Sequence, residues 1–552
     1  MVLESVNQAV RDGSLRAPVA WAPLHLCRRA LTRIELALTF RRFAWSVICL
    51  GILARLVPYL SDRSLWLDEL YLALNITSRS LPQLIQPLDH DQGAPIGFLV
   101  LQKLSTQILG NSEYSLRLIP LLSGMLSVLL FYHVANYFIG ASGASTALLL
   151  FAFSPYLVYY SSEAKQYSTD VMVSLIVYYA VARLKPGYFD ITGAVVLSLA
   201  GAIAIWMAHP SVFVLLAIAF AFTMGSVVER DWLSLRFMSV SFSIWFVSLV
   251  ICYMVAIRDL SNNASLLAYW SNRFMPFPPS SLADIRWLAV NFMFLFEQPV
   301  GLSSGVAAFL FLSGAILLAS SEKRKCLLLV SPILLTMGAS GLHLYPFGER
   351  LALFMVPSIL ILIALGIYHI KERLGRGSAV VGSIVVGVLM YQPVLAVWSL
   401  VSGEPGLEQY TDMRAVLRYV ADQRLPGDLV YLSGPAQPGG RYYGRVYGVE
   451  DFRGTWSWDW QVLAGDLEAA RGSGRVWTVV SQTGQPAGRE AEEALVSLLD
   501  RLGRRVDSFH SRGAAAYLYD LTASGGTLKG RPPGEDLPAA AAGERQTAKA
   551  TE

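Results

Sequence analysis

The stretch FAWSVICLGILARLVPYLSDRSLWLDEL, residues 43–70, joins a hydrophobic run to an acidic pair. The run 43–60 is close to the ~20 apolar residues that a helix needs to cross a bilayer. Several arginines precede it: Arg28, Arg29, Arg33, Arg41 and Arg42. Since an excess of Lys and Arg marks the cytoplasmic side of a membrane, we expect the pair Asp68–Glu69 to emerge on the outer face. A carboxylate there can take a proton from a hydroxyl or an amine, or it can simply cap a helix at the membrane surface.

The composition is that of a membrane protein. Of 552 residues, 54% are hydrophobic and 15% are charged, with a mean hydropathy of +0.46, whereas a soluble domain carries about 25% charged residues. The net charge of +4 is too small to indicate nucleic-acid binding. The four cysteines lie in the N-terminal arm, in expected spans or at an inner span end: Cys27, Cys49, Cys252 and Cys326. The sequence therefore predicts neither a disulfide framework nor a cysteine metal site.

Further hydrophobic runs follow, and basic loops between them indicate the cytoplasmic side. The loops with the Lys and Arg excess are 183–185, 229–236, 322–325 and 371–376. The runs are 118–138, 142–160, 168–183, 189–207, 209–228, 237–257, 302–320, 326–342, 347–369 and 378–399. With 43–60 they predict a polytopic α-helical membrane protein of about eleven transmembrane helices, with the N-terminus inside and the C-terminus outside. Residues 94–110 are short and amphipathic, so we expect an interfacial helix there.

Changes of composition divide the chain into four parts. Residues 1–40 are expected to be a basic cytoplasmic arm, and 41–400 the membrane domain, with 61–117 as its first outward loop. Residues 405–522 are expected to be a small extracytoplasmic α/β domain, large enough to form its own core. Its expected elements are helices 412–423 and 490–502 and strands 428–432, 476–480 and 515–519. Residues 523–552, rich in Gly, Pro, Ala and charge, are expected to be disordered.

Each expected outward loop carries ionisable or aromatic groups at the membrane edge. They are Asp89, His90, Asp91, Glu113 and Arg117 in the first loop, Glu163, Lys165 and Tyr167 in the second, His209 in the third, and Tyr345 and Arg350 in a later one. Ionisable groups at membrane depth are costly and indicate function, whereas a single Lys or Arg there can simply extend to the interface. Their recurrence on one face favours a functional site.

Four motifs, in this order, carry a resemblance to a known family. They are Leu67-Asp68-Glu69, the turn 89–95, GNSEYSLRL at 110–118 and SPYLVYYSSEAKQY at 154–167. Together they resemble polytopic GT-C fold glycosyltransferases that use polyprenyl-phosphate sugars, of the protein O-mannosyltransferase and lipid A aminoarabinose transferase type. The resemblance is strongest over residues 40–215 and continues weakly toward residue 400. The chain departs from the family at Ala94-Pro95, where Pro-Pro is common, and at Lys165, where Arg is common.

The resemblance implies sugar transfer from a polyprenyl-phosphate donor to a glycan, lipid or protein acceptor, at the outer face of a bacterial cytoplasmic membrane. Asp68 matches the family's catalytic acidic position and would be the general base of a single inverting displacement. Its catalytic neighbour Glu69 would orient the acceptor or the interfacial helix. Arg117, Lys165 and Arg350 suit the donor phosphate. The further substrate contacts are expected from Asp89, His90, Asp91, Glu163, Tyr167, His209 and Tyr345. A phosphate leaving group requires no metal or other cofactor, although Asp89, His90, Asp91 or Glu163 could hold a divalent ion.

Two other interpretations fit the sequence. An envelope polysaccharide ligase or polymerase would share the general plan but place its chemistry in a large late loop, here 258–301. A transporter or flippase would favour broken helices and charges near the middle of the membrane, whereas most spans here have apolar centres. The discriminating question is whether Asp68 or a residue of 258–301 is indispensable.

Overall fold

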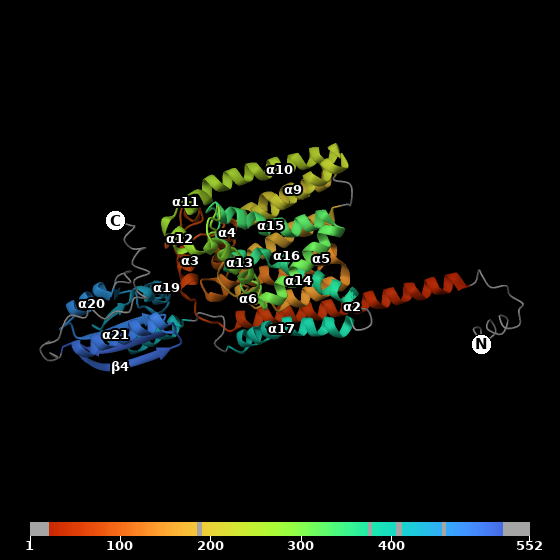
Figure 1. The fold of residues 1–552 in the computed structure, drawn as a ribbon. Helices are drawn as coiled ribbons and strands as arrows, with labels where there is room; N and C mark the ends of the chain where they lie inside the picture. Colours follow the sequence, from red (N-terminus) through yellow and green to blue (C-terminus); the bar gives the residue numbers. More distant parts are fainter. Residues whose placement is uncertain (1–20, 185–189, 374–377, 404–410, 455–459, 523–552) are drawn as a thin grey trace, which may run out of the picture.

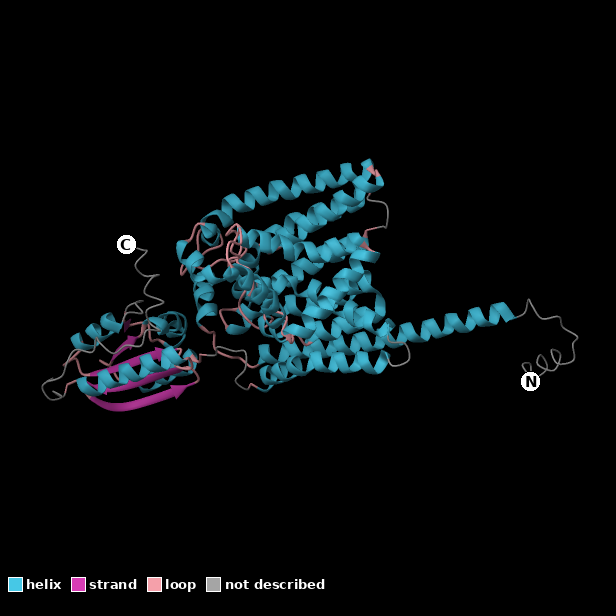
Figure 2. Cartoon of the chain, viewed as in Figure 1, coloured by secondary structure: helices cyan, strands magenta, loops and turns pink. Residues whose placement is uncertain are grey.

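The chain forms a helical bundle followed by a small α/β domain (Figures 1 and 2). The computed structural model describes residues 21–184, 190–373, 378–403, 411–454 and 460–522. Within these residues every strand lies in the C-terminal domain, as Figure 2 shows. That domain lies at one end of the bundle, next to helices α3 (Leu67–Ser78) and α4 (Ile96–Leu109), while the N-terminal half of α2 (Trp21–Leu60) projects from the opposite end (Figure 1).

Seven helical stretches of the described chain are long and apolar enough to cross a membrane. They are Phe40–Leu60, Glu113–Ala152, Ser211–Glu229, Trp232–Ser261, Ser304–Ser321, Glu349–Ile370 and Val380–Ser402. A helix satisfies its own backbone hydrogen bonds, which is what a segment without access to water needs. The expected class, a polytopic α-helical membrane protein, is confirmed.

Every expected span is found as a helix. After α2 these helices are α5 (Glu113–Ala152), α6 (Pro155–Tyr160), α7 (Tyr167–Arg183), α8 (Ile191–Met207), α9 (Ser211–Glu229), α10 (Trp232–Cys252), α14 (Ser304–Ser321), α15 (Lys323–Gly341), α16 (Val356–Arg373) and α17 (Ser378–Ser402). Four of them, α6, α7, α8 and α15, are too short or too polar to count among the seven stretches above. The number of eleven spans therefore stays a prediction.

Helix α5 covers both of the spans expected at 118–138 and 142–160. Its backbone leaves the helical conformation at Gly140, where φ is 71° and ψ is 171°. Glycine adopts this conformation without the steric cost that a Cβ brings. The second arm ends at Ala152, and the short helix α6 follows it.

Further on, α10 continues through a π-helical turn, Tyr253–Ile257, into α11 (Arg258–Ser261).

Helix α4 lies where the interfacial helix was expected. Its 14 residues reach about 21 Å, less than the ~30 Å of a hydrocarbon core. It packs against α3, α5 and α8. A Cβ on Gly97 would lie only 2.5 Å from the Met207 sulfur, so α4 closely approaches the end of α8. This length and packing support a helix that lies at the end of the bundle rather than one that crosses it.

Helix α16 and the 3₁₀ turn η4 (Glu349–Met355) that leads into it form the centre of the bundle. Residues 352–367 of this stretch are all buried, and α14 and α5 pack against α16. A Cβ on Gly366 would collide with the Leu310 carbonyl oxygen of α14, so glycine permits the two backbones to touch. Small residues at such contacts are typical of helix packing in membranes.

The segment 258–301, expected to lie outside, packs over the end of the bundle. It contains α12 (Ala264–Tyr269), the 3₁₀ turn η3 (Ser271–Arg273) and α13 (Leu282–Glu297). The Phe347 amide donates to the Arg273 carbonyl over 2.9 Å, and the Met275 amide donates to Ser340 Oγ over 2.9 Å. These bonds hold the segment against the end of α15 and the loop that precedes η4, at the same end as α3 and α4 (Figure 1).

The C-terminal domain is built on a five-stranded sheet of order β2-β1-β3-β5-β4. The strands are β1 (Leu429–Leu432), β2 (Phe452–Arg453), β3 (Arg475–Ser481), β4 (Arg504–Ser511) and β5 (Ala514–Asp520). β1 runs parallel to β2 and β3, and β5 runs antiparallel to β3 and β4. The helices are α18 (Met413–Gln423), α19 (Gln437–Tyr447), α20 (Trp460–Ala469) and α21 (Pro486–Leu502). The sequence predicted β1, β3, β5, α18 and α21 but missed β2, β4, α19 and α20.

Helix α2 begins earlier than the sequence predicted. It starts at Trp21, so the second half of the expected basic arm 1–40 is helical and continuous with the first span. The first half of that arm and the expected disordered tail 523–552 lie outside the described residues.

Candidate functional site

Asp68 lies in the first turn of α3 and is free of any capping role. The amide of Trp66, which precedes the helix, donates to Glu69 Oε2 over 3.3 Å. Glu69 therefore caps the helix, as a carboxylate in the first turn often does. The alternative in which Asp68 serves only as a cap does not describe this structure.

Asp68 is held between two cations from distant parts of the chain. Lys165 Nζ lies 2.9 Å from Asp68 Oδ1, and Arg350 Nη1 lies 3.2 Å from Asp68 Oδ2. The three side chains, which we call the charged centre, are only partly accessible, with exposed fractions of 18% for Asp68, 5% for Lys165 and 17% for Arg350. The sequence assigned all three to the site, and the structure brings them into contact.

The two cations keep Asp68 ionised. Burial alone raises the pKa of the Asp68 carboxyl, but Lys165 and Arg350 outweigh this effect and hold the pKa below its usual value. A carboxylate in this state is a weak base, because its negative charge is already stabilised. Its basicity would increase if another anion took over either cation.

Aromatic rings enclose the guanidinium of Arg350. The Tyr167 ring centroid lies 5.7 Å from its central carbon, and the Trp270 ring centroid lies 5.4 Å from it. Cations are attracted to the faces of such rings, so both rings help to fix the side chain. Tyr167 was an expected site residue, whereas Trp270 comes from the segment 258–301 and was not predicted.

Two glutamines join the expected turn at 89–95 to the charged centre. Lys165 Nζ donates to Gln92 Oε1 over 2.6 Å, and Gln166 Nε2 donates to the Gly93 carbonyl over 3.0 Å. Lys165 is therefore shared between Asp68 and this turn. Neither glutamine was predicted, because an amide carries no charge signal in the sequence.

Glu69 and Arg117 pair with one another, away from the charged centre. Arg117 Nε donates to Glu69 Oε1 over 2.9 Å and Nη2 donates to Oε2 over 2.6 Å. The remaining guanidinium contacts go to the carbonyl oxygens of Arg63 and Ser64, and the Ala164 amide also donates to Glu69. Both side chains are buried. The prediction that Arg117 binds the donor phosphate does not fit this geometry, because its guanidinium is committed to Glu69 and to two backbone carbonyls. Glu69 is equally committed to Arg117, so of its two predicted roles this geometry allows the orientation of helix α3 but not a contact with the acceptor.

Glu163 lies behind this pair as a buried carboxyl group. It is fully buried, and neither of its oxygens has a hydrogen bond of ordinary geometry within the described residues, although the Tyr159 phenol is close. Burial first, and then the negative charge of Glu69, raise the pKa of Glu163 to about 8. The group is therefore protonated near neutral pH and is available as a hydrogen-bond donor.

The turn Asp89-His90-Asp91 does not gather its side chains around one point. Asp89 pairs with Arg79 over 2.8 Å, and Asp91 accepts from Asn263 over 2.6 Å. The His90 ring stacks on Tyr71 at a centroid distance of 5.0 Å. Within the described chain no group of three or more His, Cys, Asp or Glu side chains is arranged to hold a metal ion.

His209 lies between α8 and α9, and Tyr345 lies in the loop that precedes η4. Burial lowers the pKa of His209 to about 4, so its ring is neutral, and its Nε2 has no partner among the described residues. The Tyr345 hydroxyl donates to the Leu351 carbonyl over 3.1 Å, and its ring meets Phe213 edge to face at 5.3 Å. His209 is the more available of the two for a ligand.

Several buried polar side chains were missed by the sequence analysis. Arg63 donates to the Ser162 carbonyl over 2.7 Å and lies over the Tyr159 ring. Asp170 is buried in α7, and its Oδ1 has no hydrogen-bond partner within the described residues. An ionisable residue inside an apolar run is a signal of function in itself, and this signal could have identified Asp170.

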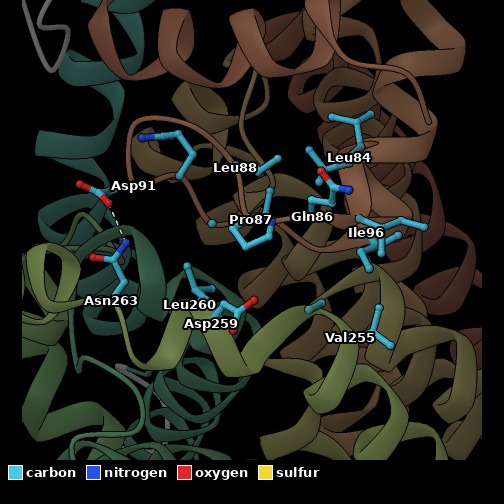
Figure 3. Close-up of a pocket in the computed structure, with 16 residues that line it drawn as sticks. Leu84, Gln86, Pro87, Leu88, Asp91, Ile96, Val255, Asp259, Leu260 and Asn263 are labelled. Carbon is cyan, nitrogen blue, oxygen red and sulfur yellow. Dashed lines mark hydrogen bonds between the residues drawn. The ribbon is translucent and has the colours of Figure 1, made fainter. Parts of the chain in front are cut away.

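A cavity of about 70 Å³ lies beside the turn that contacts the charged centre. It lies between residues 84–99 and the π-helical turn 253–257 with α11, and Figure 3 shows Asp91 and Asn263 hydrogen-bonded on one side of it. The lining combines apolar side chains, such as Leu84, Ile96 and Leu260, with polar ones, such as Asp91 and Asp259. Gln92 also lines it, and the same side chain accepts the hydrogen bond from Lys165.

Comparisons with known proteins agree with this architecture. Residues 93–270 match the family described as dolichyl-phosphate-mannose-protein mannosyltransferase. This match covers less than half of the chain and includes Glu163, Lys165 and His209 but not Asp68. A search of curated protein sequences finds no match for the chain.

Solved structures of membrane glycosyltransferases resemble the whole architecture. ArnT from Cupriavidus metallidurans bound to undecaprenyl phosphate has a TM-score of 0.53 at 14% identity, over 86% of this chain and 97% of that one. The Archaeoglobus fulgidus oligosaccharyltransferase in complex with Zn and sulfate has a TM-score of 0.51 at 12% identity, over 86% of this chain and 72% of that one. The chain therefore has the GT-C fold, as the four sequence motifs predicted.

Proposed function

We propose that the protein is a membrane glycosyltransferase that moves a sugar from a polyprenyl-phosphate donor to an acceptor. The observation that carries the proposal is the charged centre, in which one carboxylate is held by two cations at the end of a GT-C bundle. The resemblance to a structure bound to undecaprenyl phosphate supports a lipid-phosphate donor. The charge pattern supports an active site on the outer face of a bacterial cytoplasmic membrane.

The charged centre can serve one step of an inverting displacement. The phosphate of the donor would bind Lys165 and Arg350, of which the guanidinium can make two parallel contacts with phosphate oxygens. Asp68 would then lose part of its stabilisation and become a stronger base. It would take the proton of the acceptor hydroxyl or amine as the acceptor atom attacks the anomeric carbon.

The same step breaks the bond between the anomeric carbon and the phosphate oxygen. The bonding electrons leave with the polyprenyl phosphate, and the two cations stabilise its developing charge. Neutral His209, whose Nε2 has no partner among the described residues, is suited to a hydrogen bond with a sugar hydroxyl group. Tyr167 supports Arg350. Glu163, also expected to contact the substrate, is fully buried, and we assign it no substrate contact. The displacement needs no metal or other cofactor, because a phosphate carries the leaving charge well. The acceptor is a glycan, a lipid or a protein.

An envelope polysaccharide ligase or polymerase is the second candidate, and one contact favours it. Trp270 of the segment 258–301 lies over Arg350, so the late loop reaches the charged centre. If Trp270→Ala abolished activity while Asp68→Asn remained active, this second candidate would be favoured.

Lipid analysis of a strain that lacks the protein tests the proposed function. We expect one polyprenyl-phosphate sugar to accumulate, and the wild-type gene should remove the excess. Purified protein should then transfer that sugar from the extracted lipid. An unchanged lipid profile, together with no transfer by the purified protein, would overturn the proposal.

A further inference from the structure

The C-terminal domain is bonded directly to the loop that carries Asp68. In α19, the buried hydroxyl of Tyr443 accepts from the Leu65 amide over 2.8 Å and from Ser64 Oγ over 3.2 Å. The same hydroxyl donates to Glu113 Oε1 over 2.9 Å. One donor and two acceptor positions are all that a phenol offers, so Tyr443 is fully used in this contact.

A second side chain of the domain fixes the start of the same loop. Arg414 of α18 contacts the Asp62 carboxylate at 3.0 Å and Glu113 at 3.2 Å, and it also donates to the Asp62 carbonyl. Asp62 has a φ of 49°, a conformation that a residue with a Cβ rarely adopts. Arg414 binds both the side chain and the backbone at this residue, so it holds the turn that leaves α2.

Apolar packing surrounds these polar bonds. One continuous buried cluster includes Leu65, Leu70 and Leu72 of the loop and α3 together with Leu417 and Tyr442 of the domain. α19 lies along α3. The domain is therefore packed against the loop rather than tethered beside it.

The held segment ends close to Asp68. Ser64, which Tyr443 contacts from the domain, also supplies a carbonyl oxygen to Arg117 from the bundle. Arg117 in turn holds Glu69, the neighbour of Asp68. The segment 62–69 is thus fixed from two opposite bodies, and it determines where the first turn of α3 presents the Asp68 carboxylate.

We propose that Tyr443 and Arg414 are positioning residues for sugar transfer, through which the C-terminal domain sets the location of Asp68. This inference rests on the proposed function. The inference gives the C-terminal domain a part in turnover, although neither Tyr443 nor Arg414 touches the charged centre. A displacement of a catalytic group by about 1 Å can cost 10²-fold in rate, so a hydroxyl at Tyr443 is expected to matter.

The test compares two tyrosine variants of the full-length enzyme. Tyr443→Phe removes the interface hydroxyl, and Tyr431→Phe removes a matched one, which donates to Asp466 over 2.8 Å on the other side of the sheet. For Tyr443→Phe we expect kcat to fall by roughly 10–100-fold, with the donor KM nearly unchanged. Hydrogen exchange of the peptide 61–70 should become faster only in this variant.

A kcat of Tyr443→Phe equal to that of Tyr431→Phe, or an unchanged exchange rate at 61–70, would overturn the inference. If Tyr443→Phe does not fold, Arg414→Gln carries the same comparison. Wild-type enzyme without transfer activity would refute the proposed function instead, and the exchange measurement would still test the positioning of the loop.

Discussion

Glu69 of α3 and Arg117 of α5 form a two-pronged ion pair, with N–O distances of 2.9 and 2.6 Å. Glu69 is the direct neighbour of Asp68 in the sequence. Both side chains of the pair are buried, and the pair also binds the backbone at Arg63, Ser64 and Ala164. Two adjacent carboxylates thus have different environments. Glu69 joins the loops, while Asp68 faces the cations of the charged centre.

Loss of the Glu69 charge should destabilise the protein. Glu69→Gln removes the carboxylate that pairs with the buried guanidinium of Arg117, and breaking a buried pair in this way costs about 3–5 kcal/mol. We expect a clear drop in the midpoint of thermal unfolding in detergent. The control is Asp89→Asn. The Asp89 side chain is 65% exposed in its pair with Arg79, and surface pairs contribute only ~0–1 kcal/mol. Equal midpoints for the two variants would contradict the structural role of Glu69.

Arg350 should be required for binding of the donor phosphate. Arg350→Ala is expected to lose about 1.5–3 kcal/mol of donor interaction, seen as a higher donor KM or a lower kcat/KM. Arg350→Lys should recover only part, because an ammonium cannot make the two-pronged contact. Arg273→Ala is the matched control, since Arg273 pairs with the neighbouring Glu349. Normal donor kinetics in Arg350→Ala would remove this residue from the site.

The stability of the protein should fall between weakly acidic and weakly alkaline pH because of Glu163. Burial, then the charge of Glu69, raise the pKa of Glu163 from 4.5 to about 8. Above pH 4.5 the Glu163 carboxyl loses its proton in the unfolded chain but keeps it in the folded chain. The free energy of unfolding therefore decreases by up to about 1.4 kcal/mol per pH unit. This loss is complete once the pH has passed the folded-state pKa.

Glu163→Gln cannot ionise and should lack this loss. Its thermal midpoint relative to wild type should therefore rise steadily from pH 5 to pH 8.5. Glu322→Gln, which changes an exposed carboxylate paired with Lys325, should show a constant difference. Parallel pH curves for wild type and Glu163→Gln would show that the buried group is already ionised at low pH.

The charged centre should lie on the outer side of the membrane. Single cysteines at the exposed positions Asp91 and Leu344, in a background without the four native cysteines, should react with an impermeant thiol reagent in intact cells. Cysteines at the exposed positions Arg230 and Lys323 should react only after the cells are opened. Labelling at positions 230 and 323 in intact cells, with positions 91 and 344 protected, would show that the charged centre faces the cytoplasm.

The helices could be predicted because their signal is local. Runs such as 209–228 and 302–320 are apolar over the length of a membrane span, and the structure has α9 and α14 there. The early start of α2 at Trp21 was missed because its first part is too basic to read as a span. Strand β4 was missed because its side chains are largely exposed and polar, so it lacks the apolar alternation of a half-buried strand.

The roles of individual charges could be predicted only in part. Charge and position singled out Asp68, Lys165 and Arg350, and the structure brings them together. Only the family resemblance singled out Asp68 from Glu69. Charge and spacing could not separate them, because the difference lies in Arg117, the partner of Glu69, 48 positions further along the chain. The contact of Tyr443 with Leu65 spans 378 positions, and no spacing rule reaches that far.

The sugar-transfer rate of Asp68→Asn tests the central claim most directly. The substitution keeps the size of the side chain but removes the basic oxygen, and a positioned general base contributes about 10²–10⁴-fold in rate. The assay is transfer from a polyprenyl-phosphate sugar by purified enzyme, with folding checked by gel filtration and with Asp422→Asn, an exposed carboxylate of the C-terminal domain, as the control. We predict a folded Asp68→Asn protein with at least about 100-fold slower transfer beside a fully active Asp422→Asn. Transfer by Asp68→Asn within about threefold of wild type would contradict the assignment of Asp68 as the base.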